Sequence, residues 1–264
     1  MQGVQDKVVI LTGASEGIGR ALAIALHRAG ARLMLAARSS ERLAQLAGEL
    51  GEGAEWCACD VAEQSQCQAL VAHTLGAFGR VDILINNAGI TMWSRFDEAQ
   101  DLSIYETLMR VNYLGAVYLT HAALPALKAS GGQVVAVASV AGLTGVPSRS
   151  GYAASKHAMV GFFDSLRIEL APQGVAVTVI CPDFVLSQTH KRAIGPDGKP
   201  LGQSPMQEAK IMTAEQCAQL CLEAIAARKR LLITSLRGKL GRWLRLVAPG
   251  LIDRIADRAI SNRH

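Results

Sequence analysis

Short apolar runs recur along the 264-residue chain, and a segment long enough for a helix separates each run from the next. The runs lack two-residue alternation, so each is expected to be a strand covered on both faces. Strands that alternate with crossover helices form a parallel sheet. The pattern predicts an α/β fold with one doubly wound parallel sheet of about seven strands in a single domain. The predicted strands are Val8–Leu11, Arg32–Ala36, Glu55–Cys59, Val81–Ile85, Gln133–Ala138, Val175–Ile180 and Leu231–Ile233.

A glycine-rich turn follows the first predicted strand and opens a helix. Gly13, Gly17 and Gly19 lie within the segment Thr12–Gly19. Glycines at these places let backbone amides and the helix N-terminus approach a pyrophosphate closely, as in Rossmann-type nucleotide-binding folds. A tight strand-to-helix turn without a ligand is the alternative interpretation.

The end of the second predicted strand bears on which nucleotide is bound. An NAD enzyme normally carries an acidic residue there, which binds the ribose hydroxyls. This chain has Arg38 and Ser39 instead. A guanidinium and a hydroxyl suit the 2′-phosphate of NADP, so NADP (NADPH) is the expected cofactor. The alternative is that Arg38 is an ordinary solvated cation.

Two more strand ends carry polar residues at the carboxyl edge, where ligands of open α/β sheets collect. Asp60 closes the third predicted strand and is expected near the adenine amine, unless it caps the helix that follows. Asn86–Gly89 closes the fourth strand, where a turn or a sheet-bracing motif is the alternative.

Tyr152 and Lys156 are four residues apart, so on a helix their side chains share one face. The free phenol has a pKa of about 10. A cation at ~4 Å and an effective dielectric of ~20 is worth about 4 kcal/mol, enough to bring that pKa near 7. Ser139 stands upstream, at the end of an apolar run. Taken singly, the pair suits an amphipathic helix surface and Ser139 suits a strand-end cap.

The chain resembles the short-chain dehydrogenase/reductase family, in its single-domain branch, from about Lys7 to Ile233. Motifs in the family's order carry the resemblance: the segment Thr12–Gly19, the segment Asn86–Gly89, Asn112, Ser139, and Tyr152 with Lys156. Together they are far more specific than any one of them. The Tyr-x-x-x-Lys-His-Ala pattern and the basic tail look most like the hydroxysteroid-dehydrogenase-like group.

The resemblance implies an NADP-dependent enzyme that reduces a ketone or aldehyde, or oxidises the secondary alcohol, by hydride transfer. It implies that Tyr152 is the acid or base and that Lys156 lowers its pKa and holds the nicotinamide ribose. Ser139 would hydrogen-bond the substrate oxygen, and Asn112 would hold a relay water. The implied cofactor-binding residues are Gly13, Ser15, Glu16, Gly17, Ile18, Gly19, Arg38, Ser39, Asp60, Val61, Asn87, Ala88, Gly89, Tyr152, Lys156, Pro182, Val185 and Ser187.

The substrate pocket is expected to be mainly apolar, without clustered cations, which favours an aliphatic or cyclic ketone over an anion. Its expected lining is Met92, Trp93, Val140, Leu143, Val146 and Phe184. The family's strand-end Pro-Gly is Pro182–Asp183 here, and a turn aspartate that faces solvent is expected. Two alternatives stay open: a 3-oxoacyl-carrier-protein reductase, and a non-catalytic NADP-binding sensor or scaffold.

Residues 1–235 are expected to form the NADP-binding catalytic domain, with a mobile substrate loop at 183–212 that is rich in Gly and Pro. Residues 236–264 are expected to be a basic amphipathic extension that packs on the domain or on a sister subunit. On a helix its apolar face would carry Leu236, Leu240, Trp243, Leu244 and Val247. The basic face would point to water, and Pro249 would end the pattern.

Further expectations concern partners and location. The tail lacks interleaved aromatics, which argues against nucleic acid, and neither the cysteine nor the histidine spacing suits a metal. Peripheral membrane contact through residues 236–248 ranks below protein contacts. The polar start, Met1–Lys7, and the absence of a long apolar run predict no signal peptide or anchor and a cytoplasmic location. The resemblance implies a small-molecule substrate and a homotetramer or homodimer.

Overall fold

The computed structural model describes residues 3–186, 191–203 and 211–261. Its strands form one sheet of seven, in the order β3-β2-β1-β4-β5-β6-β7, and every neighbouring pair is parallel. The predicted doubly wound sheet is therefore confirmed. The strands are β1 (Val8–Thr12), β2 (Arg32–Ala37), β3 (Ala54–Ala58), β4 (Ile83–Asn86), β5 (Gln133–Val137), β6 (Ala176–Cys181) and β7 (Leu231–Ile233).

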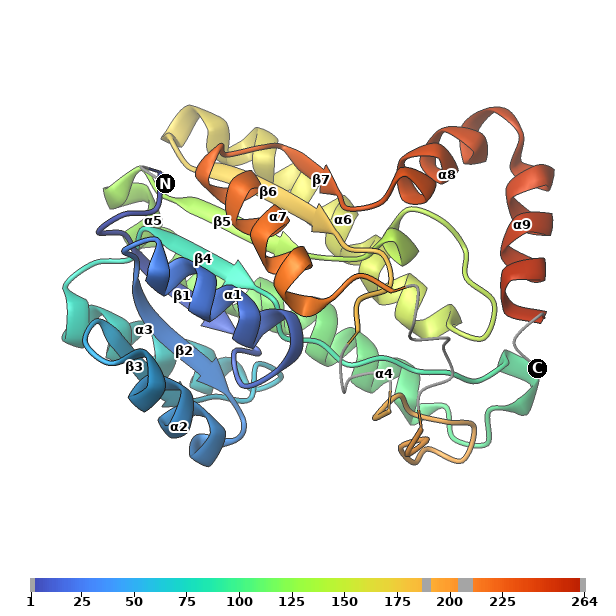
Figure 1. Ribbon diagram of the computed structural model, residues 1–264, viewed down its shortest axis with the longest axis horizontal. Coiled ribbons are helices and arrows are strands. Elements are labelled where there is room, and N and C mark those ends of the chain that lie inside the picture. Colours follow the sequence, from blue (N-terminus) through green and yellow to red (C-terminus); the bar gives the residue numbers. More distant parts are fainter. Residues whose placement is uncertain (1–2, 187–190, 204–210, 262–264) are drawn as a thin grey trace.

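Helices cover both faces of the sheet (Figure 1). One face packs against α1 (Gly17–Arg28), α2 (Ser40–Leu50) and α7 (Ala214–Ala226). The other face packs against α3 (Gln64–Phe78), α5 (Gly115–Ser130) and α6 (Ser150–Leu170). Within β1, Val9 and Leu11 belong to the apolar cluster on the side of α1, α2 and α7, and Ile10 belongs to the cluster on the side of α3, α5 and α6. Burial on both sides explains why the strands show no apolar–polar alternation.

The chain reverses its direction of winding between β1 and β4, which lie side by side at the centre of the sheet. Ligands of such sheets bind beyond the carboxyl ends of the strands at this switch point. Short elements lie on this side of the sheet, and these are η1 (Phe96–Glu98), α4 (Ser103–Met109), the π-helical turn η2 (Arg110–Leu114) and η3 (Val140–Gly142). A further turn, η4 (Ala171–Gln173), precedes β6 at the opposite edge. A capping box starts α7, with Thr213 and Gln216 bonded to each other's backbone.

The described part of the predicted substrate loop packs on the domain. Ala193 is buried against Trp93, and Ile194 forms a bridge with Met92. This segment therefore has fixed partners among the described residues, where the sequence indicated only a mobile loop.

The C-terminal extension forms α8 (Leu236–Val247) and α9 (Pro249–Ser261), an arm beside the carboxyl edge of the sheet (Figure 1). Pro249 starts a second helix, so the expectation that it ends the pattern was incomplete. Proline suits a first helical position because its missing N–H has no intrahelical partner there. Among the described helices, none is long and apolar enough to cross a membrane.

The apolar face of α8 does not pack on its own domain, and its expected contact with a sister subunit stays a prediction. Its apolar side chains point outward, with Leu240 63% and Trp243 68% exposed. Gly238 and Gly241 are the buried positions of this helix. A Cβ added at Gly238 would lie 2.8 Å from a methyl of Val140, so the missing side chain lets α8 approach the domain closely.

Candidate active site

A cavity of about 610 Å³ opens at the carboxyl edge of the sheet. It is lined by the glycine-rich turn after β1, by the ends of the central strands, by the start of α6, and by the arm formed by α8 and α9. Almost all predicted site residues line it, and these are Gly13, Ser15, Glu16, Gly17, Ile18, Gly19, Arg38, Ser39, Asp60, Val61, Asn87, Ala88, Gly89, Ser139, Tyr152, Lys156, Pro182 and Val185. Ser187 lies outside the described residues.

The glycine-rich turn is held in a shape that only glycine permits. Gly13 has a φ of +65°, and a Cβ added at Gly19 would lie 2.0 Å from the carbonyl oxygen of Gly13. The Asn87 side chain braces the turn, since its Nδ2 donates to the carbonyl oxygens of Thr12 (2.9 Å) and Gly13 (3.3 Å). Bare backbone next to a helix N-terminus fits the pyrophosphate of a dinucleotide.

The end of β2 supplies a cation to the same cavity. Arg38 is exposed, and no carboxylate among the described residues pairs with it. Its neighbour Arg42, by contrast, is paired with Glu16 at 3.0 Å, and Glu16 also contacts Arg192. Ser39 caps α2 by accepting a hydrogen bond from the backbone N–H of Arg42 (3.5 Å). Arg38 is thus a cavity-lining cation at the end of β2 that no described carboxylate neutralises.

Asp60 does not cap the helix that follows β3, because the N-cap of α3 is Glu63. Asp60 Oδ1 accepts a hydrogen bond from the backbone N–H of Ala62 at 3.0 Å, which caps the turn after β3. The residue also lines the cavity, so the cap and a contact with a nucleotide are compatible.

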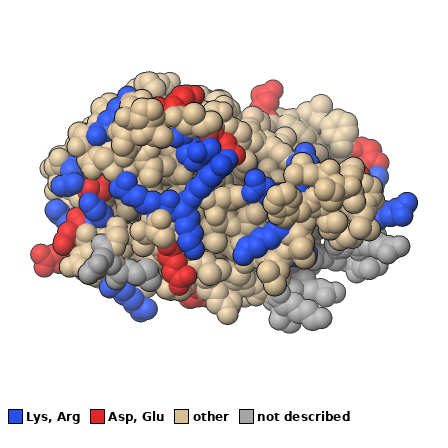
Figure 2. All heavy atoms as spheres, turned by 90° about the horizontal axis from the view of Figure 1, so that it is seen from above, with Lys and Arg blue, Asp and Glu red and all other residues tan. Residues whose placement is uncertain are grey.

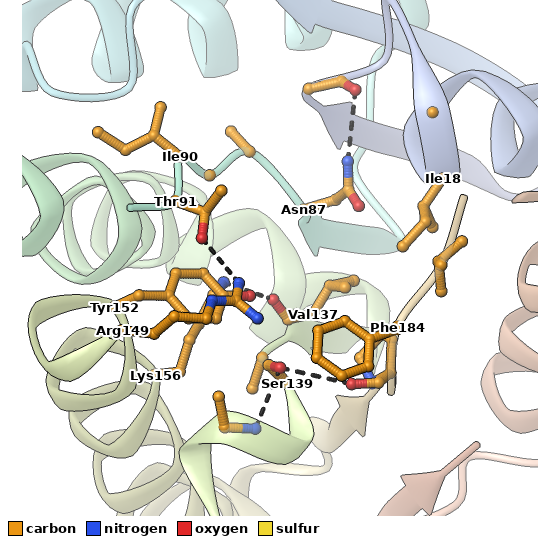
Figure 3. Close-up of a pocket in the computed structure, with 18 of the residues that line it drawn as sticks. Ile18, Asn87, Ile90, Thr91, Val137, Ser139, Arg149, Tyr152, Lys156 and Phe184 are labelled. Atoms are coloured by element: carbon orange, nitrogen blue, oxygen red, sulfur yellow. Dashed lines mark hydrogen bonds between the residues drawn. The ribbon is translucent and has the colours of Figure 1, made fainter. Parts of the chain in front are cut away.

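Ser139, Tyr152 and Lys156 come together where β5 ends and α6 begins (Figure 3). The Lys156 ammonium is buried, donates to the carbonyl oxygen of Val137 at 3.0 Å, and lies 5.9 Å from the centre of the Tyr152 ring. Ser139 Oγ lies 3.4 Å from the carbonyl oxygen of Pro182 and accepts from the N–H of Ala141. The serine is therefore a strand-end cap as well as a cavity residue.

Two nearby cations control the ionisation of Tyr152. Burial by itself would raise the pKa of the phenol, but the charges of Lys156 and Arg149 lower it, as do hydrogen bonds from Ser139 and Arg149. The result is a pKa below the ordinary value of about 10. Burial also lowers the pKa of Lys156, and the phenolate partly opposes that effect. The arrangement favours a proton that moves readily on and off the Tyr152 oxygen.

Asn112 lies behind the cavity rather than in its lining. It is fully buried in the π-helical turn, where Nδ2 donates to the Ile90 carbonyl (3.0 Å) and to Ser155 Oγ (2.9 Å). Its Oδ1 accepts from the Ile90 N–H at 2.8 Å. A carbonyl oxygen has two lone pairs, so one remains for a water. The proposed relay role of Asn112 stays a prediction.

Arg149 is a site residue that the sequence reasoning missed. It precedes α6, lines the cavity, and places its guanidinium 4.2 Å from the centre of the Tyr152 ring (Figure 3). The side chain is buried and donates to Thr91 Oγ1 at 2.7 Å. A basic residue three positions before Tyr152, at the start of the same helix, was the available signal. The cavity wall therefore holds a buried cation that the expected apolar lining did not include.

The predicted pocket lining was correct in half of its members. Val140, Val146 and Phe184 line the cavity. The others pack behind it in apolar clusters, and these are Met92, Trp93 and Leu143. The arm supplies lining that was not predicted, namely Gly238, Gly241, Ile252, Ile255 and Ala256.

Asp183 does not face solvent, so this prediction was wrong. Its carboxylate accepts hydrogen bonds from Ser235 Oγ (2.6 Å) and from two nitrogens of Arg237, at 2.7 and 3.2 Å. Burial tends to raise the pKa of this carboxyl, but the bonds from Arg237 and Ser235 hold it below its usual range. Asp183 thereby anchors the first turn of α8 beside the cavity.

No cluster of three or more His, Cys, Asp or Glu that could hold a metal ion occurs in the part of the chain that the structure describes.

Comparison with known proteins gives a consistent picture. The family model described as short chain dehydrogenase matches residues 7–195. The chain is 35% identical over 270 residues to mouse dehydrogenase/reductase SDR family member 7B, covering 98% of this chain and 83% of the relative. It is 38% identical over 253 residues to an Arabidopsis thaliana 11-beta-hydroxysteroid dehydrogenase-like 4A, covering 94% and 83%.

Solved structures agree with these similarities. A short chain dehydrogenase/reductase from Burkholderia phymatum in complex with NAD superimposes with a TM-score of 0.84 and 28% identity, over 95% of this chain and 96% of that one. An alcohol dehydrogenase from Thermococcus sibiricus complexed with 5-hydroxy-NADP gives a TM-score of 0.74 and 27% identity, over 86% and 95%.

Proposed function

The chain belongs to the short-chain dehydrogenase/reductase family, and on that premise we propose that it is an NADP-dependent reductase of a mainly apolar ketone or aldehyde, or a dehydrogenase of the secondary alcohol. One observation carries the proposal: Ser139, Tyr152 and Lys156 line the same cavity as the glycine-rich turn. An acid–base group with a lowered pKa beside a nucleotide cradle suits hydride transfer to a carbonyl.

When bound, NADPH would supply the hydride that adds to the carbonyl carbon and would leave as NADP⁺. Tyr152 donates its proton to the carbonyl oxygen as charge develops there, and takes it back in the oxidation direction. Ser139 donates a hydrogen bond to the same oxygen. Lys156 stabilises the phenolate that remains and holds the nicotinamide ribose.

The preference for NADP rests on charge at the end of β2. Arg38 is the cation there that no described carboxylate neutralises, and Ser39 adds a hydroxyl. A guanidinium binds a phosphate through charge-assisted hydrogen bonds, whereas it gives no such gain with the bare ribose of NAD. The structural relatives bind one or the other nucleotide, so this preference needs its own test.

The relatives named above are dehydrogenases, reductases or similar to them, which supports the enzyme over a non-catalytic sensor or scaffold. The rate of NADPH and NADH oxidation with cyclic, steroidal, aliphatic and 3-oxoacyl ketones tests the proposal. We expect turnover with NADPH that falls about 100- to 10,000-fold in Tyr152→Phe. Tyr118→Phe, outside the cavity, is the matched control. NADPH binding without turnover of any ketone would overturn the proposal.

We also propose a cytoplasmic homodimer or homotetramer that does not bind nucleic acid. All six cysteines are free thiols, as is usual in a reducing compartment. In the view from above (Figure 2), Lys and Arg gather over the middle of this face, Asp and Glu lie mostly toward its edges, and much of the surface is uncharged. The exposed apolar row of α8, with Leu236, Leu240 and Trp243, is a suitable contact for a sister subunit.

Light scattering tests the assembly. We expect Trp243→Glu to reduce the measured mass and to leave the cavity residues unaffected, because this side chain is 68% exposed. A monomeric wild-type protein that sediments with anionic vesicles would instead assign the apolar row to a membrane surface.

A further inference from the structure

Arg149 is a buried cation without a matching anion. It is 5% exposed, and no carboxylate among the described residues forms an ion pair with it. Its side chain donates to the neutral hydroxyl of Thr91 (2.7 Å) and hydrogen-bonds the phenol of Tyr152, and its buried Nε has no partner among the described residues. Burying a charge is costly unless it is paired, so such a cation inside an active-site cavity needs an explanation.

The surroundings of Arg149 are aromatic. Its guanidinium carbon lies 4.2 Å from the ring centre of Tyr152, 5.7 Å from that of Trp93 and 5.8 Å from that of Phe184. Cation–π contacts compensate part of the lost hydration and fix the plane of the guanidinium. They do not use its N–H donors, which form a fork that matches a carboxylate.

The position of the guanidinium relates it to the reaction. It lies over the same ring whose phenol is the proton donor, and both groups line one cavity (Figure 3). An anion bound to Arg149 would therefore lie beside the carbonyl that Tyr152 protonates. The ammonium of Lys156 already donates a hydrogen bond to the Val137 carbonyl oxygen at 3.0 Å.

We propose that Arg149 binds a carboxylate of the substrate, placed within one or two carbons of the reacting carbonyl. The natural substrate class is then an oxo acid, or the matching hydroxy acid, with an apolar tail that the remaining cavity wall accepts. This inference rests on the proposed reductase function and narrows its substrate. It replaces the expectation, drawn from the sequence, that an uncharged ketone fits better than an anion.

A matched pair of substrates tests the assignment. A phenyl-substituted α-oxo acid and its methyl ester have the same carbonyl and tail, and only the acid carries a charge. We expect the wild-type enzyme to prefer the acid. In Arg149→Met, kcat/KM for the acid should fall about 10- to 100-fold. The value for the ester should fall less, because the loss of the Arg149 charge beside Tyr152 affects both substrates, whereas the loss of the anion site affects only the acid.

The controls separate substrate binding from effects on Tyr152. Arg95→Met removes an exposed cation outside the cavity and should change neither value. An equal loss for acid and ester in Arg149→Met would mean that Arg149 serves Tyr152 rather than the substrate, and would overturn the proposal. So would no loss at all. If Arg149→Met folds poorly, Thr91→Val removes the hydroxyl that holds the guanidinium and should lower the acid preference alone.

A binding measurement distinguishes failure of this inference from failure of the proposed function. Calorimetry with phenylacetate and phenylacetamide needs no turnover, and we expect tighter binding of phenylacetate that disappears in Arg149→Met. If phenylacetate bound in this way but no ketone were turned over, the proposed anion site at Arg149 would stand and the proposed reductase function would fall. Ketone turnover with no Arg149-dependent preference for phenylacetate would retain the reductase and reject the anion site.

Discussion

Arg237 binds the carboxylate of Asp183 through two nitrogens, with Nη2 2.7 Å from Oδ1 and Nε 3.2 Å from Oδ2. Asp183 follows β6 at the carboxyl edge of the sheet, and Arg237 lies in the first turn of α8. The pair therefore connects the edge of the catalytic site to the arm that closes one side of its cavity. Arg245 adds a second connection, since its Nη1 donates to the Leu143 carbonyl at 2.7 Å.

Asp183→Asn should loosen the arm. We expect the free energy of unfolding to fall by about 1–2 kcal/mol, a value kept low because Arg237 is 58% exposed and solvent screens the pair. The KM for ketone should rise because α8 lines the cavity. Denaturant unfolding and steady-state kinetics measure the two effects. Asp97→Asn, at an exposed ion pair, is the control and should change neither.

The stabilisation from Asp183 should depend on pH in a defined direction. Its pKa is lowered in the folded protein, so its contribution is present above the unfolded value of about 3.9 and is lost as the pH falls through the folded value. The difference in unfolding free energy between wild type and Asp183→Asn should be constant near neutral pH and shrink in acid. A difference that grows in acid would contradict this account.

Lys156→Met should raise the pKa of Tyr152, because it removes the larger of the two charge effects that lower it. In the oxidation direction the phenolate is the base, so the rate rises with pH through this pKa. We expect the rising limb of kcat/KM to move to higher pH. If kcat/KM fell but its rising limb stayed at the same pH, Lys156 would serve only to bind the ribose.

Arg38→Asp should reverse the nucleotide preference. The substitution removes the phosphate-binding cation and places a carboxylate where NAD enzymes bind the ribose hydroxyls. We expect the ratio of kcat/KM for NADPH to that for NADH to fall about 100-fold. The same ratio measured for Arg95→Asp, which does not line the cavity, should not change. A constant ratio in Arg38→Asp would reject Arg38 as the phosphate-binding residue.

Gly19→Ala should abolish nucleotide binding. The new Cβ would lie 2.0 Å from the Gly13 carbonyl oxygen, so the turn must move, at a cost of about 1–3 kcal/mol in stability. Gly48→Ala is a matched control in α2, where a Cβ meets nothing within 4 Å. It should be neutral or stabilise by about 0.5–1 kcal/mol. Quenching of protein fluorescence by NADPH and thermal unfolding measure both variants.

Much of the fold could be predicted because it depends on local patterns. The strand Leu231–Ile233 was predicted to the residue, since a short apolar run between helices has few other structures available. The glycine-rich turn and the Tyr152–Lys156 spacing indicated a nucleotide-dependent redox site for the same reason. Backbone freedom at glycine and helical periodicity are both properties of a few consecutive residues.

Only the tertiary structure decided how the arm and the cavity meet. The apolar periodicity of α8 is correctly helical, but a hydrophobic pattern gives no information on a buried partner such as Asp183, 54 positions from Arg237 in the sequence. That carboxylate and the two buried glycines hold the glycine face of α8 against the domain and leave Trp243 exposed. Arg149 is a similar case. Its sequence position does not show that the fold would bury its charge beside Tyr152 with no carboxylate among the described residues to pair with it. The sequence determined the elements and the reacting groups, whereas long-range packing determined which charges those groups face.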